Sequence, residues 1–184
     1  MMIRACLLSV TLLFAVPASA KSSLPLIQKN YPGNLIFENV RSICSSGSTN
    51  ENVKRGLAVG FTKRATVEGN LGMAIDRWRE LGSTVTAMSG EIDGRPLWLI
   101  LREGGDERIC ELFDSDASRD DYLATVGQLQ TWVERQWTGA DNEMAVANLK
   151  PATITSANEV TLAYWPPPDN DVPTGISFQV VRTR

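Results

Sequence analysis

Residues 95–113 read Arg-Pro-Leu-Trp-Leu-Ile-Leu-Arg-Glu-Gly-Gly-Asp-Glu-Arg-Ile-Cys-Glu-Leu-Phe, and they carry the strongest structural signal in the chain. Two runs that favour β-strands flank the pair Gly104-Gly105. Glycine tolerates a positive φ, which the two central residues of a type I′ turn require. The stretch therefore predicts a β-hairpin, with Gly104 and Gly105 at the centre of its turn.

Counting outward from those glycines places Arg102 opposite Glu107 and Ile100 opposite Ile109. Successive side chains of a strand point to opposite faces of its sheet. One face is then almost wholly apolar and is expected to form the main core; it carries Leu97, Leu99, Leu101, Cys110 and Leu112. The other face carries Trp98, Ile100, Ile109 and Glu111.

The first 20 residues have the pattern of a secretory signal peptide. Arg4 provides the positive start, an apolar run follows, and Ala18-Ser19-Ala20 suits a cleavage site. The alternatives are a buried helix or a membrane anchor, but an apolar run of roughly 12 residues is short for a bilayer. Removing 20 of the 184 residues leaves 164, enough for one domain over residues 21–184. Residues 21–33 are expected to be flexible.

Export would leave two cysteines, Cys44 and Cys110, because Cys6 lies in the signal peptide. Two thiols in an oxidising compartment most simply form a disulfide. A reactive or metal-binding thiol pair is disfavoured, since the chain has no Cys-x-x-Cys and no histidine. We predict that the disulfide holds a helix near residue 40 against the Leu97–Leu101 face.

The remaining periodicities predict three N-terminal helices and more strands. Apolar residues at helical spacing indicate helices near 34–44, 48–60 and 70–82. Asp93-Gly94 favours a second hairpin, which pairs a strand at 84–89 with the strand from Arg95 and places Met88 opposite Leu99. A long helix is expected at 119–137, a short helix at 141–150, and strands at 159–165 and 175–182. The predicted fold is α+β: an antiparallel sheet of about five strands (a three-strand meander, a long helix, two further strands) with the N-terminal helices packed on one face.

Composition excludes several classes of function. Without Arg4 the chain has 17 basic and 21 acidic residues, so neither nucleic acid nor anionic lipid is an expected partner. The absence of histidine removes Ser-His-Asp and Cys-His hydrolases. No phosphate-binding or dinucleotide-binding glycine motif occurs, and no cofactor or metal is predicted. No other stretch is apolar enough to cross a membrane.

Two groups of acidic residues deserve consideration as sites. The run 114–121 has oxygen ligands at alternate positions, as calcium loops do, but Arg119 stands where such a loop needs glycine. Capping of the following helix explains the run more simply. The second group lies near the hairpin turns and would need to converge in a groove to act as acid and base; it comprises Glu91, Asp93, Glu103 and Asp106.

The second face of the sheet is the stronger candidate for binding. Trp98, Ile100 and Ile109 would form an apolar surface there, and Trp165 with its three prolines is a further recognition candidate. The competing interpretation is that the N-terminal segment or residues 144–149 cover this surface. Our first hypothesis is an exported, non-enzymatic binding or accessory protein of the bacterial envelope, periplasmic or secreted, whose partner is a protein or a cell-wall ligand. The alternatives are a carboxylate-dependent hydrolase of cell-wall glycan and a purely structural envelope component.

Overall fold

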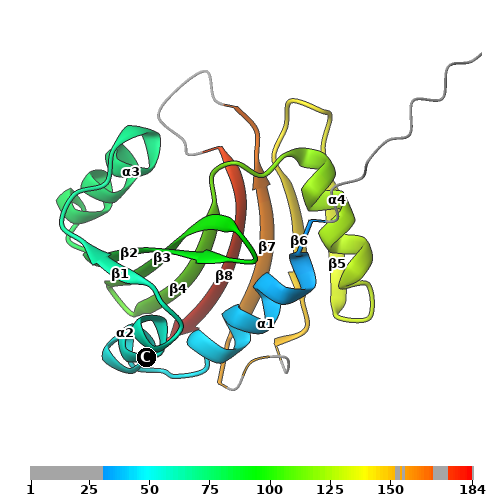
Figure 1. The fold of residues 1–184 in the computed structure, drawn as a ribbon. Coiled ribbons are helices and arrows are strands. Elements are labelled where there is room, and N and C mark those ends of the chain that lie inside the picture. Colours follow the sequence, from blue (N-terminus) through cyan, green and yellow to red (C-terminus); the bar gives the residue numbers. More distant parts are fainter. Residues whose placement is uncertain (1–30, 152–153, 155, 168–173, 184) are drawn as a thin grey trace, which may run out of the picture.

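A computed structural model describes residues 31–151, 154, 156–167 and 174–183, and its centre is one antiparallel sheet of eight strands (Figure 1). The predicted signal peptide lies outside the described residues. The strand order is β1-β2-β3-β4-β8-β7-β6-β5. In chain order the elements are α1 (Gly33–Ile43), α2 (Thr49–Ala58), β1 (Thr62–Arg64), α3 (Gly69–Glu80), β2 (Thr84–Ile92), β3 (Arg95–Gly104), β4 (Glu107–Asp114), α4 (Arg119–Gln128), β5 (Val133–Thr138), β6 (Ala145–Leu149), β7 (Glu159–Trp165) and β8 (Gly175–Thr183).

The prediction of about five strands is wrong, because β1, β5 and β6 are additional strands. The helix expected at 119–137 ends at Gln128, and the chain returns as β5. The segment around β5 is rich in Thr, Val and Trp, which favour strands, and their spacing fitted a helix by coincidence. The short helix expected at 141–150 is instead β6, whose alternating residues Ala145, Ala147 and Leu149 are buried.

The two hairpins of the meander form as predicted in kind, although one register differs. The β2–β3 turn uses Asp93 and Gly94, both with positive φ, and Met88 lies opposite Leu99. In the β3–β4 hairpin Gly104 pairs with Glu107, so Gly105 and Asp106 are the central residues. Ile100 therefore lies opposite Glu111 instead of Ile109, so the pairing is displaced by two residues along β4 from the predicted one. This even shift leaves every side chain on its predicted face.

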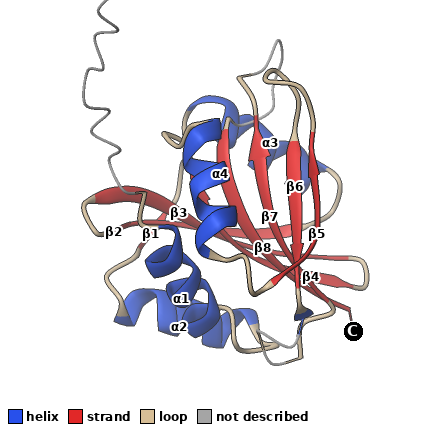
Figure 2. Cartoon of the chain, turned by 90° about the vertical axis from the view of Figure 1, so that its right-hand side faces the viewer, coloured by secondary structure: helices blue, strands red, loops and turns tan. Residues whose placement is uncertain are grey.

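The helices lie on both faces of the sheet, which corrects the prediction that the N-terminal helices share one face. Helices α1, α2 and α4 are grouped on one face (Figure 2), which we call the inner face. The main core lies there and includes Leu97, Leu99, Leu101, Cys110 and Leu112. Helix α3 stands apart from the other three and packs on the opposite face, the outer face (Figure 1).

The C-terminal end of α1 is fixed to the sheet by a disulfide and two arginines. Cys44 and Cys110 form the predicted disulfide, with 5.7 Å between their Cα atoms. The Arg182 Nη2 donates to the Cys44 carbonyl at 2.6 Å, and the Arg108 Nη1 donates to the Gly47 carbonyl at 2.6 Å. Arg108 and Arg182 lie directly opposite each other on β4 and β8. Both guanidinium groups donate to carbonyls that follow the helix and have no intrahelical partner. These hydrogen bonds offset the repulsion between the two cations.

A buried ion pair holds the other end of α1. Asp114 at the end of β4 accepts a hydrogen bond from the Tyr31 hydroxyl at 3.0 Å and from the Arg95 Nε at 2.8 Å. The Arg95 guanidinium also lies over the Tyr31 ring, 4.8 Å from its centroid. Of the predicted flexible segment 21–33, residues 21–30 lie outside the described part, whereas Tyr31 is buried in the core. Each helix of the described residues is too short or too polar to span a bilayer.

Removing the disulfide should weaken the fold substantially. The bond joins residues 66 positions apart, and closing a loop of that length restricts the unfolded chain by about 4 kcal/mol. We expect the double variant Cys44→Ala/Cys110→Ala to lose about this much free energy of unfolding in urea. Wild-type protein measured under a reductant is the matched control and should show a similar loss. A loss below about 1 kcal/mol in both would contradict a structural role for this bond.

Candidate functional site

Helix α3 covers part of the surface that the sequence suggested for binding. Its apolar residues Leu71 and Ile75 pack on Ala87, Ile100 and Phe113 of the outer face. Ile100 is therefore only 1% exposed. The stripe of α3 was readable from the sequence, but an amphipathic helix can cover either face of a sheet, and nothing local shows which.

The other three predicted surface residues lie around this helix. Trp98 and Trp165 are half-buried and pack against the cluster beneath α3. Ile109 is half-buried as well, between Arg102 on β3 and Val181 on β8. Trp98 also lines a hollow of about 280 Å³ at the first turn of α3, together with Phe113, Ser115 and Thr174. A binding role for these residues stays a prediction.

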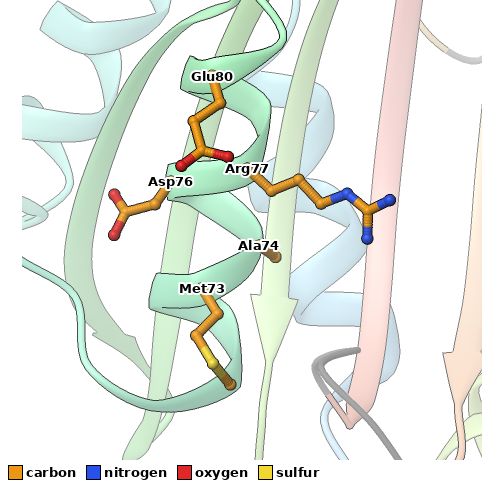
Figure 3. A pocket seen from close by; sticks show the side chains of 5 residues that line it. All are labelled: Met73, Ala74, Asp76, Arg77 and Glu80. Carbon is orange, nitrogen blue, oxygen red and sulfur yellow. The ribbon is translucent and has the colours of Figure 1, made fainter.

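A second hollow runs along the solvent side of α3 (Figure 3). It measures about 330 Å³ and is lined by Met73, Ala74, Asp76, Arg77 and Glu80. Arg77 and Asp76 extend from the helix in opposite directions and do not converge on a common point (Figure 3). Asp76 is instead bound to Arg79, at 3.0 Å. All five described lining residues come from one helix, so the hollow is a shallow surface depression with charged side chains in solvent.

The pairing of the strands aligns two rows of side chains across the outer face. We name the first the tryptophan row; from β3 to β5 it consists of Trp98, Phe113, Ser177, Ala163, Val146 and Trp137. The second, the polar row, lies beside it and consists of Glu111, Gln179, Thr161, Asn148 and Arg135. Ile100 continues the polar row onto β3, where α3 covers it.

Only half of the outer face has a helix over it. Among the described residues α3 is the helix on this face, and it packs over β2, β3 and β4. The portion formed by β8, β7, β6 and β5 carries half-buried Asn148, Thr161 and Gln179. Trp137, at the far end of its row, is 52% exposed. Ser177 and Ala163 of the same half are buried, so the accessible surface is the strip that joins the exposed indole to these amide and hydroxyl groups.

Glu111 lies at the boundary between the covered and uncovered halves. It is buried, and its Oε1 accepts hydrogen bonds from the Ser177 hydroxyl and, at 3.3 Å, from the Gln179 amide. Burial raises the pKa of this carboxyl, and the two hydrogen bonds and the charge of Arg102 oppose that rise. The Arg102 guanidinium itself lies over the Trp78 ring of α3, 4.8 Å from its centroid.

The acidic residues considered from the sequence do not form a joint site. Glu91 and Asp93 lie at one end of β3, and Glu103 and Asp106 at the other; a ten-residue strand separates such ends by roughly 30 Å. In the run 114–121, Ser118 and Asp121 form a capping box at the start of α4. Among the described residues no cluster of three or more Cys, Asp or Glu side chains could hold a metal ion.

Comparison with other proteins adds no relative. No protein-family model matches this sequence, and no curated protein or solved structure matches it either. The function must therefore be argued from the chemistry of the outer face itself.

Replacing the buried carboxyl should change how stability depends on pH. Because the pKa of Glu111 is raised in the folded state, its contribution to stability is complete below about pH 4.5 and is lost as the pH rises through the folded-state pKa. Glu111→Gln removes this loss, so the variant should gain free energy of unfolding relative to wild type between pH 4 and pH 8.

Urea unfolding at a series of pH values measures this effect, with Glu134→Gln on the exposed edge strand as the control. The Glu134→Gln variant should follow the wild-type profile. If the free energy of unfolding of Glu111→Gln also follows the wild-type pH profile over this range, burial does not raise the pKa of the Glu111 carboxyl.

Proposed function

We propose that this chain is an exported, non-enzymatic binding protein of the bacterial envelope and that it binds its ligand on the outer face of the sheet. The observation that carries the proposal is the uneven cover of this face: one helix over β2–β4 and no described helix over β5–β8. Sheets with one face on the core and one in solvent are common, but an exposed tryptophan beside aligned polar groups is typical of a recognition surface.

A binding role is better supported than catalysis. Hydrolysis of a glycan by carboxylates requires two acids on either side of the scissile bond. Glu111 is the only carboxylate in either row of the outer face, and its Oε1 is engaged by Ser177 and Gln179. The pairs near the hairpin turns lie at opposite ends of β3. Glu159 lies on the same face beside the polar row, but it accepts the Thr161 hydroxyl at 2.9 Å, and Glu111 is buried, so the surface does not present two free acids to a ligand.

Export is the other part of the proposal. Disulfides persist in oxidising compartments, and the Cys44–Cys110 bond is consistent with folding outside the cytoplasm. The pattern of residues 1–20 is that of a secretory signal peptide, which would direct the chain across the inner membrane.

Expression of the full chain in a Gram-negative host tests this route. We expect the protein in the periplasmic fraction to begin at Lys21, as measured by intact mass, because cleavage follows Ala20. A control with arginine at Leu12 and Leu13 interrupts the apolar run and should keep residues 1–20 and stay in the cytoplasm. Full-length wild-type protein in the cytoplasm would contradict export.

Photo-crosslinking in living cells tests the surface. A benzophenone amino acid at Thr161, in the middle of the outer face, should give a discrete adduct with the ligand on irradiation. The same probe at Leu57, which is exposed on α2 at the opposite face, is the matched control and should not give it. An adduct from both positions, or from neither, would contradict binding on the outer face.

A further inference from the structure

We infer that the ligand of the outer face is a glycan strand, which lies along the accessible part of the polar row, from Gln179 towards Arg135, and reaches Trp137. This inference rests on the proposed function and names the chemical class of its ligand. It requires a surface with an aromatic platform, hydrogen-bonding groups in both directions, and little net charge. The described residues supply each of these.

Trp137 is the aromatic platform. It is 52% exposed at the end of the tryptophan row. A Cβ added at Gly139 would lie 2.7 Å from the Trp137 Cη2, so the indole is seated against this glycine. An indole presents a flat, electron-rich face, and the C–H bonds on one side of a sugar ring are a suitable partner for it. The next residue along the row, Val146, is half-buried, and Ala163 beyond it is buried, so neither rises above the indole.

The polar row supplies hydrogen bonds next to this platform. Arg135 and Asn148 make no side-chain hydrogen bond to any other described residue, which leaves their donors and the Asn148 carbonyl for a ligand. Thr161 donates its hydroxyl to Glu159 at 2.9 Å and keeps its acceptor lone pair. Gln179 commits one amide donor to Glu111 at 3.3 Å. A sugar hydroxyl both donates and accepts, so it can use each of these groups.

The charges and sizes of the side chains favour a glycan over a protein partner. The accessible charges of this surface are one acid, Glu159 beside Thr161, and one base, Arg135, so it attracts neither polyanions nor polycations. Protein interfaces concentrate their binding energy in a buried cluster of large anchors. This surface instead presents the small side chains of Thr161 and Asn148, both of which are half-buried.

The length of the surface also suits an extended chain. Three inter-strand spacings separate Gln179 on β8 from Arg135 on β5. At about 4.8 Å each, this is roughly 14 Å, which exceeds the size of a single sugar ring. A linear glycan can therefore contact the polar row through more than one of its sugar rings.

Co-sedimentation of the oxidised protein with insoluble glycans tests this inference. The probes are purified peptidoglycan sacculi, chitin and cellulose. We expect wild-type protein to pellet with at least one of them, and Trp137→Ala to bind it about tenfold more weakly because the stacking platform is lost. Asn148→Ala should bind severalfold more weakly, since it removes a hydrogen-bonding group without touching the indole.

Trp132→Ala is the matched control, because Trp132 is 37% exposed and lies under Arg41 of α1, away from the outer face. It should bind the glycan as wild type does. Unchanged melting temperatures exclude misfolding of the variants. Loss of binding in Trp132→Ala equal to that in Trp137→Ala would overturn the inference, as would a wild-type protein that pellets with none of the three glycans.

The two proposals fail separately. A protein adduct at Thr161 together with no glycan binding would replace the glycan by a protein partner and leave a binding function on the outer face. An absence of any Thr161-specific adduct, together with no glycan binding, would remove both.

Discussion

The junction between the C-terminal end of α1 and the paired strands β4 and β8 is the constraint on which the rest of this structure depends. The Cys44–Cys110 disulfide joins the helix to β4, and the buried Arg182 of β8 donates to the carbonyl of the same Cys44. A buried guanidinium is costly unless its donors are satisfied, and here the end of a helix satisfies one of them. With Tyr31 fixed to Asp114 at the other end, α1 is held along the inner face. The inner face is thereby committed to the core, and only the outer face remains to meet a ligand.

The outer face is the side of the sheet that does not form the main core. Its eight strands carry one described helix, and the boundary of that helix falls at Glu111. A carboxyl at this position loses hydration free energy on folding, which the hydroxyl of Ser177 and the amide of Gln179 offset only in part, so the pKa rises. Hydrophobic residues at Glu111, Ser177 and Gln179 would pack a second covering layer better. Of these three, Glu111 and Ser177 are buried and bonded to each other, and only Gln179 is half-buried, so it is the one that reaches the surface.

Sequence reasoning reached the parts of the fold that depend on local periodicity. The meander, the two faces of β3 and β4, and the disulfide followed from alternation and from the count of cysteines. The register of the β3–β4 hairpin did not, because Gly104, Gly105 and Asp106 offer two equivalent two-residue turns. Strand β5 was missed because Val133 and Trp137 lie four residues apart and extend the apolar stripe of α4. The side of the sheet on which α3 lies depends on tertiary packing and has no local signal.

The candidate site was less accessible to sequence than the fold, and the reason is topological. Glu111 and Ser177 are 66 residues apart, and they meet only because β8 inserts between β4 and β7. The alternation within each strand predicts that Thr161, Gln179 and Asn148 share a face with their immediate neighbours, but not that they align in one row. That alignment requires the strand order, and the core joins side chains from β2, β3, β4, β6, β7 and β8, which are far apart in the sequence. Trp98 was identified because it lies inside the hairpin that carries the strongest structural signal. Trp137 was assigned to the wrong element, and so the exposed end of its own row was not seen. A binding surface assembled across strands in this way is a property of the sheet as a whole, which is why motif spacing alone does not reveal it.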